Sequence, residues 1–356
     1  MRYQNTSFYF LSGTGNSYRV ATWAGEVAHS QDVLAEVIPI GRASPETDLK
    51  LGPENLVGLF FPIHGFTAPW TMIRFTLRLP PGRGTHAIVA PARGGVRFGP
   101  VHFPGLEGTG AYLLALILLL KGYSMRGVIG VDMPANWTSL HPGFSQTSAE
   151  IIVARSRPRV ISFIQAVLVG ERRFSFWTFF ALILGIALIP ISMGYMLAGR
   201  FFLSRLFFAT GKCDGCGLCA RDCPVGAIRM VGKDRPRPYW AFTCESCMRC
   251  MNFCPRGTIE ASHLLAVGLY YLTTIPVGFL LLKWLAGQLP FLERLNDPFL
   301  ANLLQYVYML GALFLAYLVF HRLVRVTLLN KIFTYATLTH YYRRYHEPGT
   351  KLKDMR

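Results

Sequence analysis

All eight cysteines of this 356-residue chain lie between residues 213 and 254, in a repeated pattern. The stretch reads C-x2-C-x2-C-x3-C-P twice, at Cys213, Cys216, Cys219 and Cys223 and again at Cys244, Cys247, Cys250 and Cys254. A tight loop with two-residue gaps can present three thiolates to one iron–sulfur cube, and a fourth thiolate completes it. Zinc sites need four ligands each at looser spacing, and disulfide frameworks belong to small secreted domains. The spacing therefore predicts two [4Fe–4S] clusters.

The doubled motif resembles that of bacterial two-cluster ferredoxins, which predicts a ferredoxin domain over residues 209–260. In that family the last cysteine of each run ligates the other cluster. The resemblance therefore implies one cluster on Cys213, Cys216, Cys219 and Cys254, and a second on Cys244, Cys247, Cys250 and Cys223. Gly215 and Gly217 would allow the backbone of the first run to wrap closely around sulfide.

A second group of residues suited to ligand binding lies near the N-terminus. An apolar run at 7–11 predicts a buried strand, and a helical pattern follows at 18–28. Backbone N–H groups and hydroxyls at such a helix N-terminus bind phosphate, and here they come from Ser12, Gly13, Thr14, Gly15, Asn16 and Ser17. The loop lacks the lysine of a Walker A motif and the G-x-G-x-x-G dinucleotide pattern. An ordinary glycine-rich turn is the alternative.

This loop resembles the flavodoxin phosphate loop, S/T-x-T-G-N-T/S, which implies that it binds the phosphate of FMN. Further strands are expected at 56–61, 86–89 and 128–131, alternating with helical stretches. That alternation predicts an α/β, doubly wound, flavodoxin-like domain over residues 1–170, with its ligand beyond the strand C-termini. The loops after these strands would surround the flavin ring through Pro62, Ile63, His64, Gly65, Phe66, Ala92, Arg93, Gly94 and Gly95, joined by residues 132–137.

Taken together, the two parts resemble the fusion family in which a flavodoxin-like domain precedes a two-cluster ferredoxin. The Met133-Pro134-x-Asn136-Trp137 stretch is similar to that family's. Arg93 would place a cation near the flavin and raise its reduction potential, or it pairs with a carboxylate. His64 is a proton donor to the flavin or an ordinary loop histidine. The sequence identifies no catalytic residue.

The composition points to a membrane. Hydrophobic residues make up 52% of the chain and charged residues 15%, and the net charge is +17. Basic residues do not interleave with aromatics as in a nucleic-acid site, so nucleic acid is not an expected partner. Three apolar segments, 174–199, 264–282 and 299–320, are long enough to span a bilayer, with buried core helices as the alternative. The run at 113–120 is too short and predicts a buried helix over 111–121.

The distribution of charge predicts the sidedness. Residues 322–356 form a basic tail that the positive-inside rule places in the cytoplasm. We therefore expect transmembrane helices at 263–285 and 299–321. The segment 174–208 would enter the membrane, return and continue as an interfacial helix, or else span it. A re-entrant segment needs cover from the two spanning helices or from a second subunit of a homodimer. No signal peptide is expected, and the redox domains would face the cytoplasm from the inner membrane.

These features predict an oxidoreductase of the electron-transfer flavoprotein or ferredoxin type. A flavin handles two electrons and a cubane one, so one chain holding both joins two-electron to one-electron chemistry. The expected donor is soluble, a ferredoxin or similar protein, and the expected acceptor is a quinone or another membrane redox partner. Two alternatives remain: an electron-delivery subunit for a separate membrane reductase, and a reductase of a lipid or isoprenoid substrate at FMN.

Overall fold

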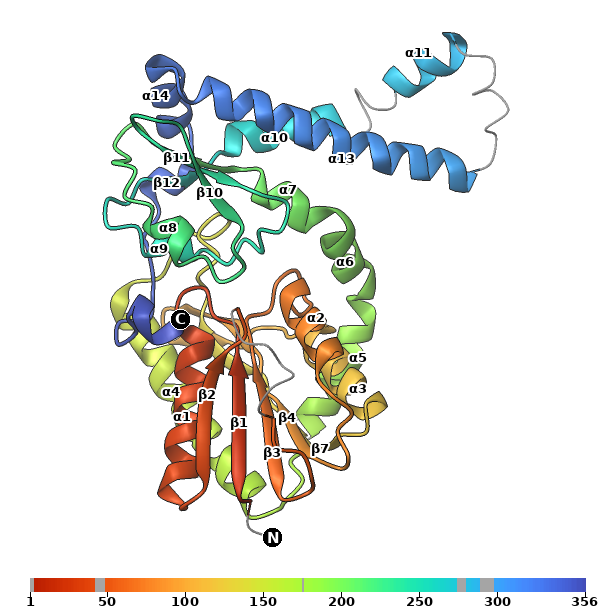
Figure 1. Ribbon diagram of the computed structural model, residues 1–356, viewed down its shortest axis with the longest axis vertical. Helices are drawn as coiled ribbons and strands as arrows, with labels where there is room; N and C mark the ends of the chain where they lie inside the picture. The colour runs from red at the N-terminus through yellow and green to blue at the C-terminus, as the bar shows by residue number, and fades with distance from the viewer. Residues whose placement is uncertain (1–2, 42–48, 175, 274–279, 289–297) are drawn as a thin grey trace.

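The computed structural model describes residues 3–41, 49–174, 176–273, 280–288 and 298–356. An α/β domain holds the N-terminal half of the chain, and a smaller cysteine-containing domain lies beyond the C-terminal edge of its sheet (Figure 1). A long helix projects from the smaller domain, and the C-terminus returns to the α/β domain. The α/β domain and the cysteine domain therefore meet at the edge where doubly wound folds bind ligands.

The α/β domain is built on a five-stranded parallel sheet with the order β2-β1-β3-β4-β7. Its strands are β1 (Asn5–Phe10), β2 (Leu34–Pro39), β3 (Asn55–Phe60), β4 (His86–Val89) and β7 (Ser124–Val128). When these five strands are numbered in chain order, the sheet has the 2-1-3-4-5 order of flavodoxin-like folds. Such folds bind ligand where the order reverses, here between β1 and β3. The predicted doubly wound α/β class is confirmed.

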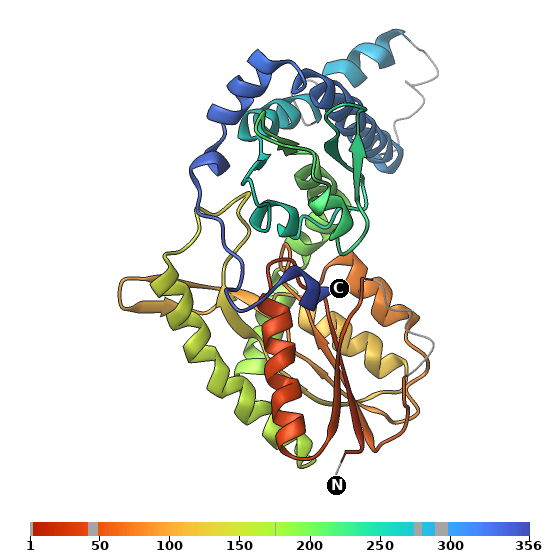
Figure 2. The ribbon, with the colours of Figure 1, turned by 60° about the vertical axis from the view of Figure 1, so that its left-hand side comes forward.

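Helices cover both faces of this sheet (Figure 2). Apolar residues of α1 (Asn16–Ser30) and α4 (Gln146–Leu168) pack on one face, and those of α2 (Trp70–Arg78) and α3 (Gly110–Leu120) on the other. Because both faces are covered, the central strands β3 and β4 are buried along their whole length. The predicted helix at 111–121 is confirmed as α3.

The strand expected at 128–131 is wrong. The chain ends β7 at Val128, turns through Ile129 and Gly130, and begins another strand, β8 (Val131–Pro134). β8 pairs with β5 (Ala92–Phe98) and extends a small sheet that also contains β6 (Val101–Phe103). Arg93 and Gly95 therefore belong to a strand and not to a loop. Val128 ends one strand and Val131 begins the next, and because both are apolar the sequence was interpreted as a single strand.

The cysteine domain contains two antiparallel pairs of short strands. β9 (Phe207–Ala209) pairs with β12 (Ile259–Ala261), and β10 (Ile228–Val231) pairs with β11 (Arg237–Trp240). A one-turn helix contains the third cysteine of each run, α8 (Leu218–Arg221) in the first and α9 (Arg249–Asn252) in the second. Trp240 is fully buried at the centre of the domain. The two runs are thus held as similar loop–helix units.

Among the described residues, one helix is long and apolar enough to cross a membrane: α13 (Pro298–Leu323), over the 25 residues Phe299–Leu323. The predicted segment 264–282 begins as α10 (His263–Thr273) and ends in α11 (Leu280–Gln288), while its residues 274–279 lie outside the described part. α14 (Thr327–Tyr335) follows α13. Tyr308 of α13 donates to the Leu272 carbonyl of α10 at 2.8 Å, so these two helices lie side by side.

The first apolar segment forms α5 (Phe176–Ala187), α6 (Ile189–Gly194), the π-helical turn η1 (Tyr195–Gly199) and α7 (Arg200–Ser204). It bends by 61° between its two halves. Cover from spanning helices or a second subunit was the expectation, but the segment packs mainly on the α/β domain. Ser192 donates to the Phe66 carbonyl at 2.9 Å, and Gly185 lies directly against Gly108. The segment also contacts α13, where Tyr306 donates to the Leu197 carbonyl.

Candidate functional site

The predicted phosphate loop follows β1 and leads directly into α1. Gly15 has φ of 98°, a left-handed conformation that favours glycine, and its N–H donates to the Ser12 hydroxyl at 3.1 Å. The first-turn N–H groups of a helix have no intrahelical acceptors, so those of Asn16 and Ser17 are available to an anion. The loop therefore has the geometry of a phosphate site.

A cavity of about 250 Å³ opens beside this loop. The residues predicted to contact the flavin line the cavity, with three exceptions: Gly15, which turns behind the loop, and Gly95 and Asp132, which are paired within β5 and β8. The loops after β3 and β8 complete its walls. From the cysteine domain the cavity receives Ser246, Cys247 and Met248. The ligand pocket is thus shared by both domains.

The wall of the cavity has polar groups that suit a flavin. Four buried side-chain atoms of lining residues have no hydrogen-bond partner within the described protein: Ser17 Oγ, His64 Nδ1, Trp137 Nε1 and Ser246 Oγ. Buried polar groups are normally paired, so unpaired ones around a cavity indicate a polar ligand. The Trp137 indole stacks on His64, with centroids 5.6 Å apart. These residues fit FMN, whose ring is flat and whose edges carry hydrogen-bonding atoms.

The structure shows the surroundings of Arg93 and His64, whose roles the sequence left open. Arg93 lines the cavity but also donates to Asp132 at 2.8 Å and forms an ion pair with Glu107. Its charge is therefore largely balanced by carboxylates, which weakens an effect on the flavin potential. Burial lowers the pKa of His64 to about 4, so the ring is neutral at pH 7. A neutral imidazole can hydrogen-bond to the flavin but is not a cationic proton donor.

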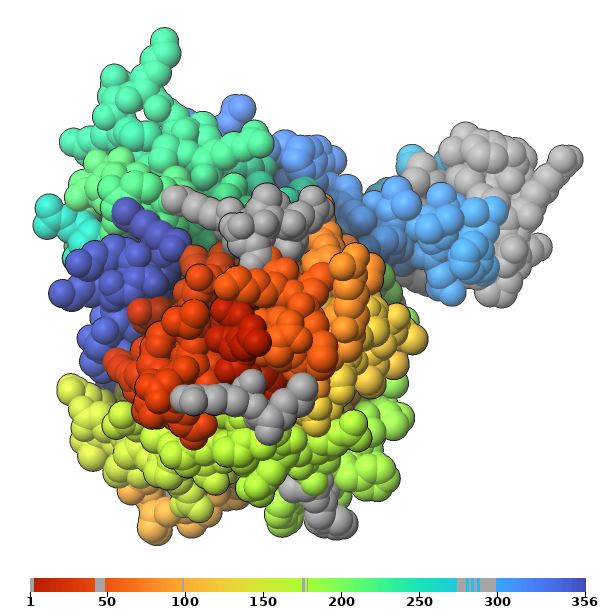
Figure 3. All heavy atoms as spheres, turned by 60° about the horizontal axis from the view of Figure 1, so that its bottom comes forward, coloured from red at the N-terminus to blue at the C-terminus, as the bar shows by residue number. Residues whose placement is uncertain are grey.

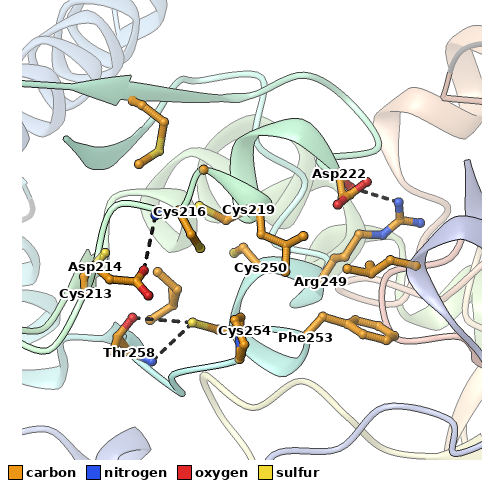
Figure 4. Close-up of a pocket in the computed structure, with 16 residues that line it drawn as sticks. Cys213, Asp214, Cys216, Cys219, Asp222, Arg249, Cys250, Phe253, Cys254 and Thr258 are labelled. Atoms are coloured by element: carbon orange, nitrogen blue, oxygen red, sulfur yellow. Dashed lines mark hydrogen bonds between the residues drawn. The ribbon is translucent and has the colours of Figure 1, made fainter. Parts of the chain in front are cut away.

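The structure brings Cys254 of the second run to Cys213, Cys216 and Cys219 of the first, around one hollow (Figure 4). Burial raises the pKa of Cys219 to about 12, with Cys213, Cys254 and Cys216 adding to the shift. Thr258 donates its N–H to the Cys254 sulfur at 3.4 Å. Cys250, a predicted ligand of the second cluster, also borders this hollow. The arrangement matches the ligand set predicted for the first cluster.

The second group is closer to the flavin cavity. Burial raises the pKa of Cys247 to about 11, and the nearby Cys223 raises it further. Burial likewise raises the pKa of Cys244 and of Cys250, with Cys247 a neighbour of both. Ala227 donates to the Cys223 sulfur at 3.3 Å, matching the bond from Thr258 to Cys254. Because thiols with raised pKa bind metal only as thiolates, cluster assembly must release protons.

The two domains make a direct backbone contact at the phosphate loop. A Cβ added to Gly13 would lie 1.8 Å from the Cys247 carbonyl oxygen, so only glycine fits there. Arg249, two residues after Cys247, donates to the Ser12 carbonyl. A predicted cluster ligand and a predicted FMN-binding residue are therefore in van der Waals contact.

Several residues of the site had no signal in the sequence. Ser246 and Met248 occupy the x positions of a cysteine motif, where the spacing says nothing about side chains. Tyr345 donates to Asn16 Oδ1 at 3.2 Å although they are far apart in the chain. Asn136, within the predicted loop 132–137, contacts Thr14 of the phosphate loop.

Comparisons with known proteins gave a family match to the cysteine domain and solved structures of low identity. Residues 212–258 match the family described as 4Fe-4S dicluster domain. Flavodoxin of Streptococcus pneumoniae TIGR4 is 12% identical and covers 46% of this chain and 98% of its own, with a TM-score of 0.31. For two-electron reduced flavodoxin of Megasphaera elsdenii these values are 13%, 46%, 99% and 0.30. Flavodoxin 1 of Bacillus cereus gives 15%, 44%, 97% and 0.29. No curated protein matches the chain.

The strand order makes the N-terminal half flavodoxin-like, and the cysteine domain is of the 4Fe–4S ferredoxin type. Together they are characteristic of an iron–sulfur flavoprotein of electron transfer.

Proposed function

We propose that this protein is a membrane-attached oxidoreductase that passes electrons between FMN, two [4Fe–4S] clusters and a quinone. The contact between Gly13 and the Cys247 carbonyl carries the proposal, because it brings the two predicted cofactor sites together. FMN supplies the step between two-electron and one-electron chemistry. The chain's own residues hold its phosphate at the N-terminus of α1 and enclose its ring between His64, Trp137 and Met248.

The route inward would begin at the first cluster. Cys216 is exposed, and a Cβ added to the neighbouring Gly217 would have no atom within 4 Å. A soluble donor could therefore approach this ligand set closely. Cys250, a predicted ligand of the second cluster, borders the hollow of the first, and Cys247 contacts the flavin loop. The order donor, first cluster, second cluster and flavin follows from these positions.

The contacts at both ends of the membrane part support one-sided redox domains. The His263 N–H, at the start of α10, donates to the Thr337 hydroxyl at 3.0 Å, and Thr337 follows α14. Both ends of residues 263–323 are thus fixed to the cysteine domain. If α13 crosses a bilayer, the chain must cross a second time between residues 263 and 297. This agrees with the expectation of two crossings and cytoplasmic redox domains.

The outer surface of the α/β domain supports a membrane location as well. Large apolar side chains are exposed on α3, α5 and α6, including Leu120 at 79% and Trp177 at 73%. α13 extends toward the same side of the molecule on which these helices lie (Figure 1). A bilayer on that side would cover both surfaces.

A cavity of about 820 Å³ between α3, α5 and α6 supports a lipid-soluble acceptor. Its walls are almost entirely apolar, and the hydroxyls of Thr109 and Ser192 at one end both donate to the Phe66 carbonyl. Phe66 also lines the flavin cavity. An isoprenoid tail in the apolar part would place a quinone ring near the loop that contacts FMN. This observation favours direct quinone reduction over delivery to a separate reductase.

The test is reoxidation of the reduced, purified protein by a short-chain quinone, followed by flavin and cluster absorbance. We expect rapid reoxidation, and strong slowing in Ala115→Trp, which fills the apolar cavity. Leu77→Trp is the control, because Leu77 is 52% exposed on α2 and outside that cavity. Inertness of the wild-type protein toward quinones would contradict the acceptor and favour the electron-delivery subunit.

A further inference from the structure

We propose that the C-terminal segment 343–356 is a working part of the flavin site, holding the phosphate loop from behind so that tight FMN binding depends on it. The inference rests on the FMN site proposed above. The sequence predicted only that the basic tail 322–356 lies in the cytoplasm.

The segment lies between the two domains and against the start of α1 (Figures 2 and 3). After α14 and the short helix η3 (Leu338–Tyr341) it passes the cysteine domain, where His346 stacks on Phe253 with centroids 4.4 Å apart. It ends in η4 (Leu352–Met355), and Arg356 pairs with buried Asp222 at 2.7 Å. The tail is thus anchored to the cysteine domain near both of its ends.

Three contacts join the tail to the loop and to α1. The Glu347 N–H donates to the Thr14 carbonyl at 2.8 Å. The Tyr345 hydroxyl donates to Asn16 Oδ1 at 3.2 Å. Arg19 in the first turn of α1 donates to both oxygens of the buried Glu347 carboxylate at 2.7 Å. No tail residue lines the cavity itself among the described residues, so the contacts are made from outside.

Loop and tail are packed closely. A Cβ on Gly15 would lie 2.8 Å from the Glu347 Cβ and 3.0 Å from the Thr350 Cβ. The loop therefore cannot move outward without displacing the tail. Thr350 also donates to the Glu347 carboxylate, which fixes that side chain in place.

These contacts matter because of how a peptide loop binds an anion. In a trans peptide the N–H points opposite to the preceding C=O, so fixing a carbonyl on one side aims the next N–H at the other. Arg249 engages the Ser12 carbonyl and thereby orients the Gly13 N–H. Glu347 engages the Thr14 carbonyl and orients the Gly15 N–H, which donates to Ser12 Oγ. The tail therefore fixes the loop in its anion-binding form.

The charges of the tail are consistent with this role. Glu347 is an anion near a phosphate site, and its charge is balanced by Arg19. Removing the cation alone leaves a buried carboxylate to repel the phosphate, whereas removing the carboxylate frees Arg19 to attract it. Arg19→Gln should therefore weaken FMN binding more than Glu347→Gln does.

The experiment titrates FMN into full-length protein stripped of flavin, using quenching of flavin fluorescence. Tyr345→Phe should weaken binding about three- to tenfold, the worth of one hydrogen bond. Tyr341→Phe is the matched control, because Tyr341 is 67% exposed and bonds only the Tyr335 carbonyl among its described contacts. Removing residues 343–356 should weaken binding about 100-fold, within the usual range of coupling between sites.

A second measurement is independent of folding of the variants. If the tail strengthens FMN binding, FMN must equally protect the tail. Trypsin should therefore cleave wild-type protein after Lys351 or Lys353 more slowly with FMN than without it. Equal cleavage rates together with unchanged FMN affinity in Tyr345→Phe and in the truncated protein would overturn the inference while leaving the flavin proposal intact. A wild-type protein that holds both clusters but never binds FMN would overturn both.

Discussion

The two cysteine runs have the same spacing but different backbones. In the first run, glycines occupy the left-handed positions, Gly215 with φ of 77° and Gly217 with φ of 71°. In the second run the equivalent positions are Ser246 and Met248, with φ of 50° and 63°. A residue with a Cβ pays about 1–2 kcal/mol in this conformation. The second run therefore keeps a strained backbone that the first run avoids.

The surroundings of the two runs explain the difference. The first run faces outward: Cys216 is exposed, and nothing lies within 4 Å of a Cβ placed on Gly217. The second run faces the flavin cavity, where Ser246 and Met248 are both buried. Strain at a ligand site persists when side chains are needed there. The comparison indicates an outer cluster for a soluble partner and an inner cluster for the flavin.

Removing one ligand from each run tests these roles most strongly. Cys247→Ala and Cys216→Ala should each reduce the iron content from about eight to about four atoms per chain. Only Cys247→Ala should interrupt the path at the flavin, and flavin reduction by the remaining cluster should slow at least about 100-fold because electron transfer falls steeply with distance. Stopped-flow absorbance measures this rate. Equal slowing in both variants would remove the distinction between inner and outer clusters.

Disrupting the contact between the two domains at Gly13 should have the next largest effect. Gly13→Ala places a methyl group on the Cys247 carbonyl, and overpacking of this kind costs about 1–3 kcal/mol. We expect loss of FMN with both clusters retained, measured by flavin content and iron content. Gly194→Ala is the control, because nothing lies within 4 Å of its added Cβ. Normal FMN content in Gly13→Ala would show that the two domains are not in contact there.

Exchanging the strained residues tests the reason for the strain. Met248→Gly should relieve about 1 kcal/mol of backbone strain and also remove apolar cover from the flavin. We therefore expect FMN binding about tenfold weaker, while Gly217→Met, which adds strain far from the flavin, should leave FMN binding unchanged and lower thermal stability. Fluorescence titration and thermal unfolding distinguish the two. Equal FMN affinity in both variants would show that Met248 is not kept in its strained conformation for flavin binding.

The buried His64 predicts a smaller effect of pH. Burial lowers its pKa from 6.5 to about 4, so on acidification the unfolded chain takes up the proton first. Stability is therefore complete above pH 6.5 and decreases as the pH falls toward 4, by up to about 1.4 kcal/mol per pH unit. His86, whose pKa burial also lowers to about 4, adds a similar dependence. His64→Gln should reduce the slope of thermal stability against pH in this window, and an unchanged slope would contradict a neutral His64.

The elements with local signals could be predicted, and those that depend on long-range packing could not. The cysteine spacing and the Ser-Gly-Thr-Gly-Asn-Ser loop are local, and the structure brings each set together. β2 was not expected, because it is an edge strand with a polar, half-exposed face. The position of Ser246 and Met248 at the flavin depends on the docking of two domains, which no spacing encodes.

The tail shows the same limit more clearly. Its eight Lys and Arg residues against two acids from His321 onward predicted only a cytoplasmic basic tail. Arg356 and Arg344 instead pair with Asp222 and Glu260, carboxylates buried in the cysteine domain. A charge count cannot distinguish arginines that contact lipid from arginines that pair inside the protein, because the partners lie about a hundred residues away in the chain.

The central claim is that the inner cluster and the flavin are neighbours, and electron paramagnetic resonance of the partly reduced protein tests it directly. The flavin radical should show a broadened, fast-relaxing signal in the wild-type protein and in Cys216→Ala, because a paramagnetic cluster lies beside it. In Cys247→Ala the signal should become narrow and slow to relax. A narrow, slowly relaxing flavin radical in wild-type protein with both clusters reduced would contradict the account.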